Sequence, residues 1–81
     1  LPILELVLQG KREEALKQYE RIRDIDPAQI RSHVNLGILY FELNRPEDAV
    51  RELKATLKLD PENEAAENAL DVVCRVVGGC D

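Results

Sequence analysis

The fold of this 81-residue chain is decided by the stretch from Ile30 to Asn63, which reads IRSHVNLGILYFELNRPEDAVRELKATLKLDPEN. Features of this stretch recur in the rest of the chain at a fixed step of 34 positions. Residues related by that step are Glu13 and Glu47, Ala15 and Ala49, and Asp26-Pro27 and Asp60-Pro61. A constant step of this length is the sequence signature of a repeat architecture.

The same step relates Gly10, Asn44 and Gly78. Glycine and asparagine are the residues that best tolerate the left-handed conformation that ends a helix. A helix is therefore predicted to end at each of these three positions, and Pro46 suits the first turn of the helix that follows Asn44. No segment alternates with period two, so strands are not expected. The predicted helices span residues 2–9, 12–25, 28–43, 46–59 and 62–77.

The unit from Ile30 to Asn63 resembles the tetratricopeptide repeat (TPR) family, whose unit is a 34-residue helix–turn–helix. The residues that carry the resemblance are Leu36-Gly37, Tyr40, Ala49 and Leu59-Asp60-Pro61. The departures are His33 where the family prefers Trp, Leu53 where it prefers an aromatic residue, and Thr56 where it prefers Ala. The resemblance implies an all-α fold, a right-handed stack of antiparallel helix pairs with about five helices.

The chain is expected to form a single domain of this kind. Residues 1–27 would be a truncated first repeat with its second helix complete, 28–61 a full repeat, and 62–81 a C-terminal capping helix and tail. The predicted helix 62–77 carries a polar face, and Asp71 stands at the position equivalent to Gly37. Because burying an unpaired carboxylate is expensive, no further helix is expected to pack there.

The predicted helices differ in how much of their surface is apolar. Helix 46–59 has one apolar stripe, and its opposite side is expected to be exposed to solvent. Glu47, Arg51 and Glu52 are among the residues expected on that exposed side. Helix 28–43 is apolar around most of its circumference and is expected to be buried on several sides. There, Gly37 weakens the helix, and a close approach of a neighbouring helix would compensate.

Composition excludes several classes of function. The chain has 11 Lys and Arg against 16 Asp and Glu, a net charge of −5, which argues against nucleic acid as a partner. Ser32, Thr56 and His33 are the only residues of their kinds, too few for a nucleophile with its base and orienting group, so the chain is not expected to be an enzyme or to need a cofactor. No apolar run approaches the roughly 20 residues of a membrane span. His33 is expected to pack in the core, since a metal site needs several convergent ligands.

In TPR arrays the first helices of successive units line a concave groove that takes peptides or helices. The resemblance thus implies a function in protein–protein interaction, with an apolar helix or peptide segment docked in the groove. Carried over by position, the groove residues are Leu4, Val7, Leu8, Arg31, Val34, Asn35, Ile38, Phe41, Glu42, Val72 and Val76. A clamp for the C-terminal carboxylates of chaperone tails is not expected, because Asn35 alone matches the donors that such a clamp needs.

An alternative function is self-association. Helix 2–9 is apolar nearly all round, and a helix of that kind is normally buried. Upstream repeats, a partner or a second copy of the chain would cover it. The chain is therefore expected to be either the C-terminal end of a longer array or an oligomerisation element that self-associates through helix 2–9 and the apolar stripe of the groove. Both hypotheses remain open at the level of sequence.

The two cysteines, Cys74 and Cys80, are predicted to be free thiols. Six residues of continuous helix would separate them by about 9 Å, beyond bridging distance. A fold-back of the tail at Gly78-Gly79 would permit a disulfide instead. Free thiols favour a reducing compartment such as the cytoplasm.

Overall fold

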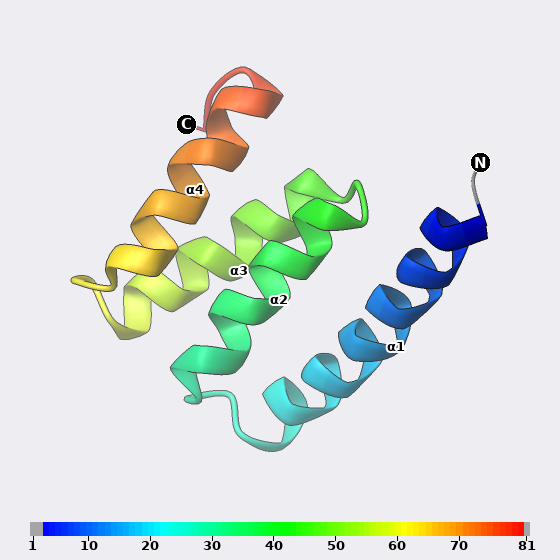
Figure 1. Cartoon of the computed structure of the whole chain (residues 1–81). Helices are drawn as coiled ribbons and strands as arrows, with labels where there is room; N and C mark the ends of the chain where they lie inside the picture. Colours follow the sequence, from blue (N-terminus) through cyan, green and yellow to red (C-terminus); the bar gives the residue numbers. More distant parts are fainter. Residues whose placement is uncertain (1–2, 81) are drawn as a thin grey trace.

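The computed structural model describes the backbone of residues 3–80 and the side chains of residues 8–80. It has four helices, α1 (Ile3–Ile25), α2 (Ile30–Glu42), α3 (Pro46–Leu59) and α4 (Glu64–Val77) (Figure 1). No strand occurs within residues 3–80. The chain is an all-α stack, as the sequence predicts.

Helix α2 lies at the centre of the stack and contacts each of the other three helices. Leu36 of α2 and Leu53 of α3 are fully buried in the core between these two helices. A Cβ atom placed on Gly37 would lie 2.7 Å from Leu53 Cγ, which is closer than side-chain atoms tolerate. The close helix–helix approach expected at Gly37 is thus observed, and it accounts for glycine inside a helix.

Two of the three predicted chain reversals are confirmed. Asn44 has φ 62° and Gly78 has φ 90°, so both adopt the left-handed conformation directly after a helix. The amide of Arg45 donates to the carbonyl of Tyr40 at 2.7 Å, and that of Gly79 donates to Cys74 at 2.7 Å. These hydrogen bonds satisfy carbonyls that a helix end leaves without partners.

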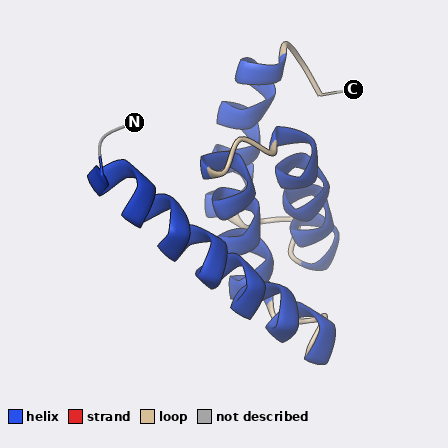
Figure 2. Cartoon of the chain, turned by 90° about the vertical axis from the view of Figure 1, so that its right-hand side faces the viewer, coloured by secondary structure: helices blue, strands red, loops and turns tan. Residues whose placement is uncertain are grey.

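The predicted reversal at Gly10 is wrong. Helix α1 runs through Gly10, so one helix of 23 residues replaces the two predicted at 2–9 and 12–25. The position equivalent to Pro46 is Arg12, which keeps the backbone N–H that proline lacks, so the helical hydrogen bonds can continue. In Figures 1 and 2 the first turns of α1 lie apart from the other three helices.

The prediction of two free thiols is also wrong, because Cys74 and Cys80 form a disulfide with their Cα atoms 5.2 Å apart. Helix α4 ends at Val77, and the positive φ angles of Gly78 and Gly79 turn the tail back toward Cys74. A separation of about 9 Å would hold only if the helix continued to Cys80. Since the two cysteines are not free thiols, they give no reason to favour a reducing compartment.

Candidate functional site

An apolar hollow of about 210 Å³ lies between α2 and α4. Its lining consists of Gly37, Ile38, Phe41, Leu53, Ala69, Val72 and Val73. Gly37 has no side chain, so the side chain of Leu53 on α3 packs directly against it, and both residues form part of the lining. We call this hollow, together with its two rims, the α2–α4 groove.

The rims of the α2–α4 groove are exposed aliphatic side chains. Ile38 on α2 is 41 % exposed and Val72 on α4 is 49 % exposed. One turn further along α4, Val76 is 65 % exposed and extends the apolar surface beyond the hollow. A continuous apolar surface framed by two helices is typical of an interaction site.

Three of the sequence-predicted site residues, Ile38, Phe41 and Val72, line the hollow. Val34 is 8 % exposed and belongs to the core, so it offers little surface to a partner. Arg31 is exposed at the start of α2, outside the lining. The side chains of Leu4 and Val7 lie outside the described residues.

The remaining predicted residues have other surroundings. Asn35 donates a hydrogen bond to Tyr19 Oη at 3.2 Å. Glu42 lies 3.9 Å from the guanidinium of Arg12 on α1. Leu8, on the projecting part of α1, is 39 % exposed and is not part of the lining.

Four residues that line the hollow are absent from the groove residues predicted from the sequence: Gly37, Leu53, Ala69 and Val73. The sequence indicates a role for Gly37 and Leu53 in packing between helices, and the structure shows that both also line the hollow. A glycine on a helix with large apolar neighbours is the sequence signal for both roles. Because Leu53 packs directly against Gly37, the same contact holds α2 and α3 together and supplies part of the lining.

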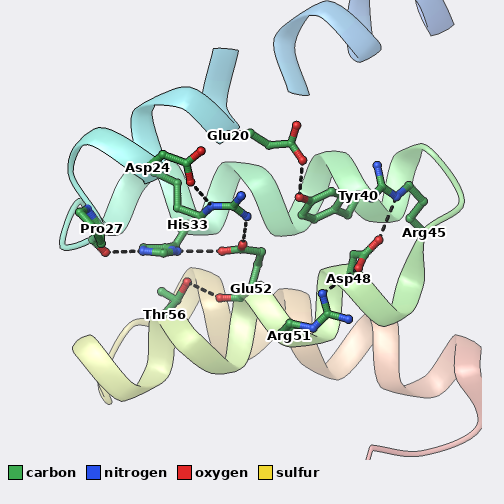
Figure 3. Close-up of polar contacts among 11 residues, drawn as sticks. Glu20, Asp24, Pro27, His33, Tyr40, Arg45, Asp48, Arg51, Glu52 and Thr56 are labelled. Atoms are coloured by element: carbon green, nitrogen blue, oxygen red, sulfur yellow. Dashed lines mark hydrogen bonds and ion pairs between the residues drawn. The ribbon is translucent and has the colours of Figure 1, made fainter. Parts of the chain in front are cut away.

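A second feature is a buried ion cluster of Arg23, His33 and Glu52, which joins α1, α2 and α3 (Figure 3). Glu52 Oε2 lies 2.8 Å from His33 Nδ1, and Glu52 Oε1 accepts from Arg23 Nη1 at 2.5 Å. The second ring nitrogen of His33, Nε2, hydrogen-bonds the carbonyl of Pro27. The prediction that Glu52 faces solvent is wrong, since the residue is 8 % exposed.

Each charged or polar group of the ion cluster has a hydrogen-bond partner. The hydrogen bond to Glu52 raises the pKa of the Arg23 guanidinium further above its ordinary value, so Arg23 stays charged. Among the described side chains, no buried nitrogen or oxygen lacks a hydrogen-bond partner. A fully satisfied cluster of this kind holds helices together and presents no free group to a substrate.

Tyr40 joins α2 to α1 on the same side of the molecule. Its hydroxyl donates to Glu20 at 2.7 Å, and the guanidinium of Arg45 lies 4.7 Å from the ring centre (Figure 3). Burial, and then the hydrogen bond to Glu20, raise the pKa of Tyr40. Both effects favour the neutral phenol, which acts here as a structural donor.

No three His, Cys, Asp or Glu residues come together as a potential metal site in the described part of the chain. Within that same part, none of the helices combines the length and hydropathy needed to cross a membrane.

Comparison with protein families gives one match. A family model described as tetratricopeptide repeat matches residues 6–71, which is most of the chain. The matched range covers α2 and α3 completely, together with most of α1 and the first half of α4. A search of curated proteins finds no match.

Proposed function

Since the chain belongs to the tetratricopeptide repeat family, generally a non-catalytic protein–protein interaction module, we propose that it docks an apolar helix of another protein in the α2–α4 groove. The observation that carries the proposal is the pair of exposed aliphatic rims, Ile38 and Val72, above a hollow with an entirely apolar lining. Full burial of such a side chain contributes about 1.5–3 kcal/mol, and about half of that remains to be gained at Ile38 and Val72, before the costs of association.

The lining also indicates what shape of ligand fits. It presents no hydrogen-bonding side chain, so an extended peptide pressed into it would leave backbone groups without partners. A helix satisfies its own backbone and can insert apolar side chains spaced three and four residues apart. We therefore favour a helix with an apolar stripe over an extended segment.

The charges near the groove are already paired. Arg75 lies 2.8 Å from Asp71 on the same helix, and Glu42 faces Arg12. Asn35, whose amide already donates to Tyr19, is the only residue that matches the donors of a carboxylate clamp. These contacts support recognition through apolar area and argue against a clamp for a charged chain terminus.

The arrangement of α4 supports a further part of the proposal, that this helix caps a longer array. Its outward residues Glu64, Glu67, Asn68, Asp71 and Arg75 are all exposed. Terminal units with a polar outer face keep repeat arrays soluble. We accordingly propose a layout of a partial first repeat over residues 1–27, a full repeat over 28–61 and a cap over 62–81.

The docking proposal can be tested with helices selected from a displayed library of amphipathic helical peptides. Peptides that bind the chain should lose at least tenfold in affinity to Ile38→Glu and to Val72→Glu, because each change puts a charge on a rim of the groove. Ile25→Glu is the matched control, since Ile25 is 80 % exposed at the far end of α1. Selected peptides that bind both rim variants as tightly as the unchanged chain would contradict the proposal.

A stability measurement must accompany the binding measurement. Ile38→Glu is expected to leave unfolding nearly unchanged, whereas Leu36→Glu should unfold the chain, because Leu36 is fully buried and Ile38 is 41 % exposed. Equal loss of stability in both variants would show that Ile38 is a core residue.

A further inference from the structure

The first unit of the stack is incomplete in a way that the second unit reveals. Residues 12–25 of α1 are equivalent to α3, and residues 3–9 are equivalent to residues 37–43, the second half of α2. In the second unit those two segments form a hairpin around Asn44. In the first unit they form one straight helix through Gly10, so residues 3–9 do not return along residues 12–19.

Because residues 3–9 do not fold back, residues of α1 are more exposed than the equivalent residues of α3. Ala49 and Leu53, at the start of α3, are fully buried. Their equivalents in α1, Ala15 and Tyr19, are only partly buried. The surface that a returning helix would cover in the first unit is therefore partly open.

The segment that fits this surface is present in the chain. Residues 3–9 read ILELVLQ, and Leu6 is equivalent to Tyr40, which is 4 % exposed in the hydrophobic core. Because α1 is straight, these residues cannot reach residues 12–19 of their own chain. They can reach residues 12–19 of a second copy.

We propose that two copies of this chain exchange residues 3–9. Two α1 helices lie antiparallel about a two-fold axis near Gly10 and Lys11, and each copy supplies the helix missing from the other's first unit. The contacts are those of an intramolecular hairpin, which is the defining property of a domain-swapped dimer.

The residues near the axis suit a helix crossing. Gly10 has no side chain, and a Cβ atom placed there would have no neighbour within 4 Å in a single copy. The apolar residues lie further out along both helices, with residues 3–8 of one copy opposite Ala15 and Tyr19 of the other. The α2–α4 groove is not part of this dimer contact, so a result that contradicts the exchange does not contradict the docking proposal, and the reverse also holds.

Arg12→Pro tests the exchange directly. Proline at this position would restore the equivalent of Asn44-Arg45-Pro46 and break the continuous helix, so residues 3–9 could fold back within one chain. Sedimentation velocity of the 81-residue chain from micromolar to millimolar concentration should show a dimer, and Arg12→Pro should be monomeric throughout. Arg12→Ala removes the ion pair with Glu42 without breaking the helix and should remain a dimer.

Two results would overturn the inference: a chain that stays monomeric over the whole range, or a folded Arg12→Pro variant that dimerises as the unchanged chain does. If circular dichroism shows that Arg12→Pro is unfolded, Leu6→Glu replaces it, and its persistence as a dimer counts against the exchange. In a mixture of isotope-labelled and unlabelled chains, contacts between residues 3–9 of one and the Ala15 methyl of the other should appear by filtered NMR. Ile38→Glu should leave the dimer unchanged, which separates it from pairing through the groove.

Discussion

The first and second units of this molecule share one 34-residue pattern but adopt different shapes. At equivalent positions, Asn44 reverses the chain with φ 62°, whereas Gly10 lies inside a helix. A residue that tolerates the left-handed conformation is therefore not sufficient to end a helix. Pro46 stands two positions after Asn44, and Arg12 stands two positions after Gly10. The comparison indicates that this proline makes the reversal obligatory.

The same comparison shows where the stability of the chain is concentrated. The residues of α3 that face α2 are fully buried, and their equivalents in α1 remain partly open. The second unit has helices on both sides, whereas the described part of the first unit packs mainly on α2. Paired substitutions at equivalent positions can measure this difference.

The largest expected difference is between Leu53→Ala and Tyr19→Ala, which change equivalent residues of the two units. Leu53→Ala should lower the free energy of unfolding by about 2–5 kcal/mol, because it leaves a cavity at a fully buried position. Tyr19→Ala should cost less, because Tyr19 is only partly buried and loses one hydrogen bond, to Asn35. Urea unfolding of both variants at low protein concentration tests the comparison, and equal losses would show that the two units are packed alike.

The next effect concerns the ion cluster that joins the two units. Glu52→Gln should destabilise the chain by about 2–3 kcal/mol, because it leaves Arg23 and His33 without their buried carboxylate. This loss is smaller than the roughly 3–5 kcal/mol typical of a broken buried pair, because the side chain of Arg23 is 29 % exposed. Glu47→Gln, at an exposed position of the same helix, is the control and should change stability by less than about 0.5 kcal/mol. A matching loss in both variants would mean that Glu52 acts as a surface residue.

A third comparison should give effects of opposite sign. Asn44→Ala should destabilise the chain by about 1 kcal/mol, because alanine resists the left-handed conformation. Gly10→Ala should stabilise it by about 0.5–1 kcal/mol, because alanine is the better residue in a helix interior and its Cβ meets nothing within 4 Å. Thermal unfolding at low concentration measures both, and a destabilising Gly10→Ala would indicate that Gly10 reverses the chain in solution.

The smallest expected effect is a loss of stability at high pH from Tyr40. The pKa of Tyr40 in the folded chain is raised above its ordinary value of 10.0, so its contribution is complete below pH 10. As the pH rises above 10, the unfolded chain loses this proton first, and stability falls until the folded pKa is passed. Urea midpoints between pH 9 and 11 should therefore fall more steeply for the unchanged chain than for Tyr40→Phe, and parallel curves would contradict the assignment.

Much of the fold follows from the spacing of residues in the sequence. The predicted helices 28–43, 46–59 and 62–77 correspond to α2, α3 and α4, with starts and ends that differ by no more than two residues. These elements were predictable because local signals agree there, namely Asn44 with Pro46 and Asp60-Pro61 with the apolar stripe of α3. At Gly10 the local signal was incomplete, and the two predicted helices became one.

The features that the sequence did not predict depend on contacts between distant residues. Glu52 stands among the polar residues of α3, and its burial follows from His33, 19 positions earlier, and Arg23, 29 positions earlier. The Cys74–Cys80 disulfide depends on two consecutive residues with positive φ, which spacing alone does not determine. For the α2–α4 groove, the repeat register alone identifies the rims Ile38 and Val72, whereas the hollow between them depends on how α2, α3 and α4 pack together.

The ion cluster also bears on how the stack comes apart. In most repeat arrays each unit touches only its neighbours through apolar contacts, and terminal units can open alone. Here Arg23, near the end of α1, is held by Glu52 of α3, so the last turns of α1 cannot detach without leaving buried charge behind. Amide protons in these turns should therefore exchange together with those of α2 and α3, as one cooperative unit.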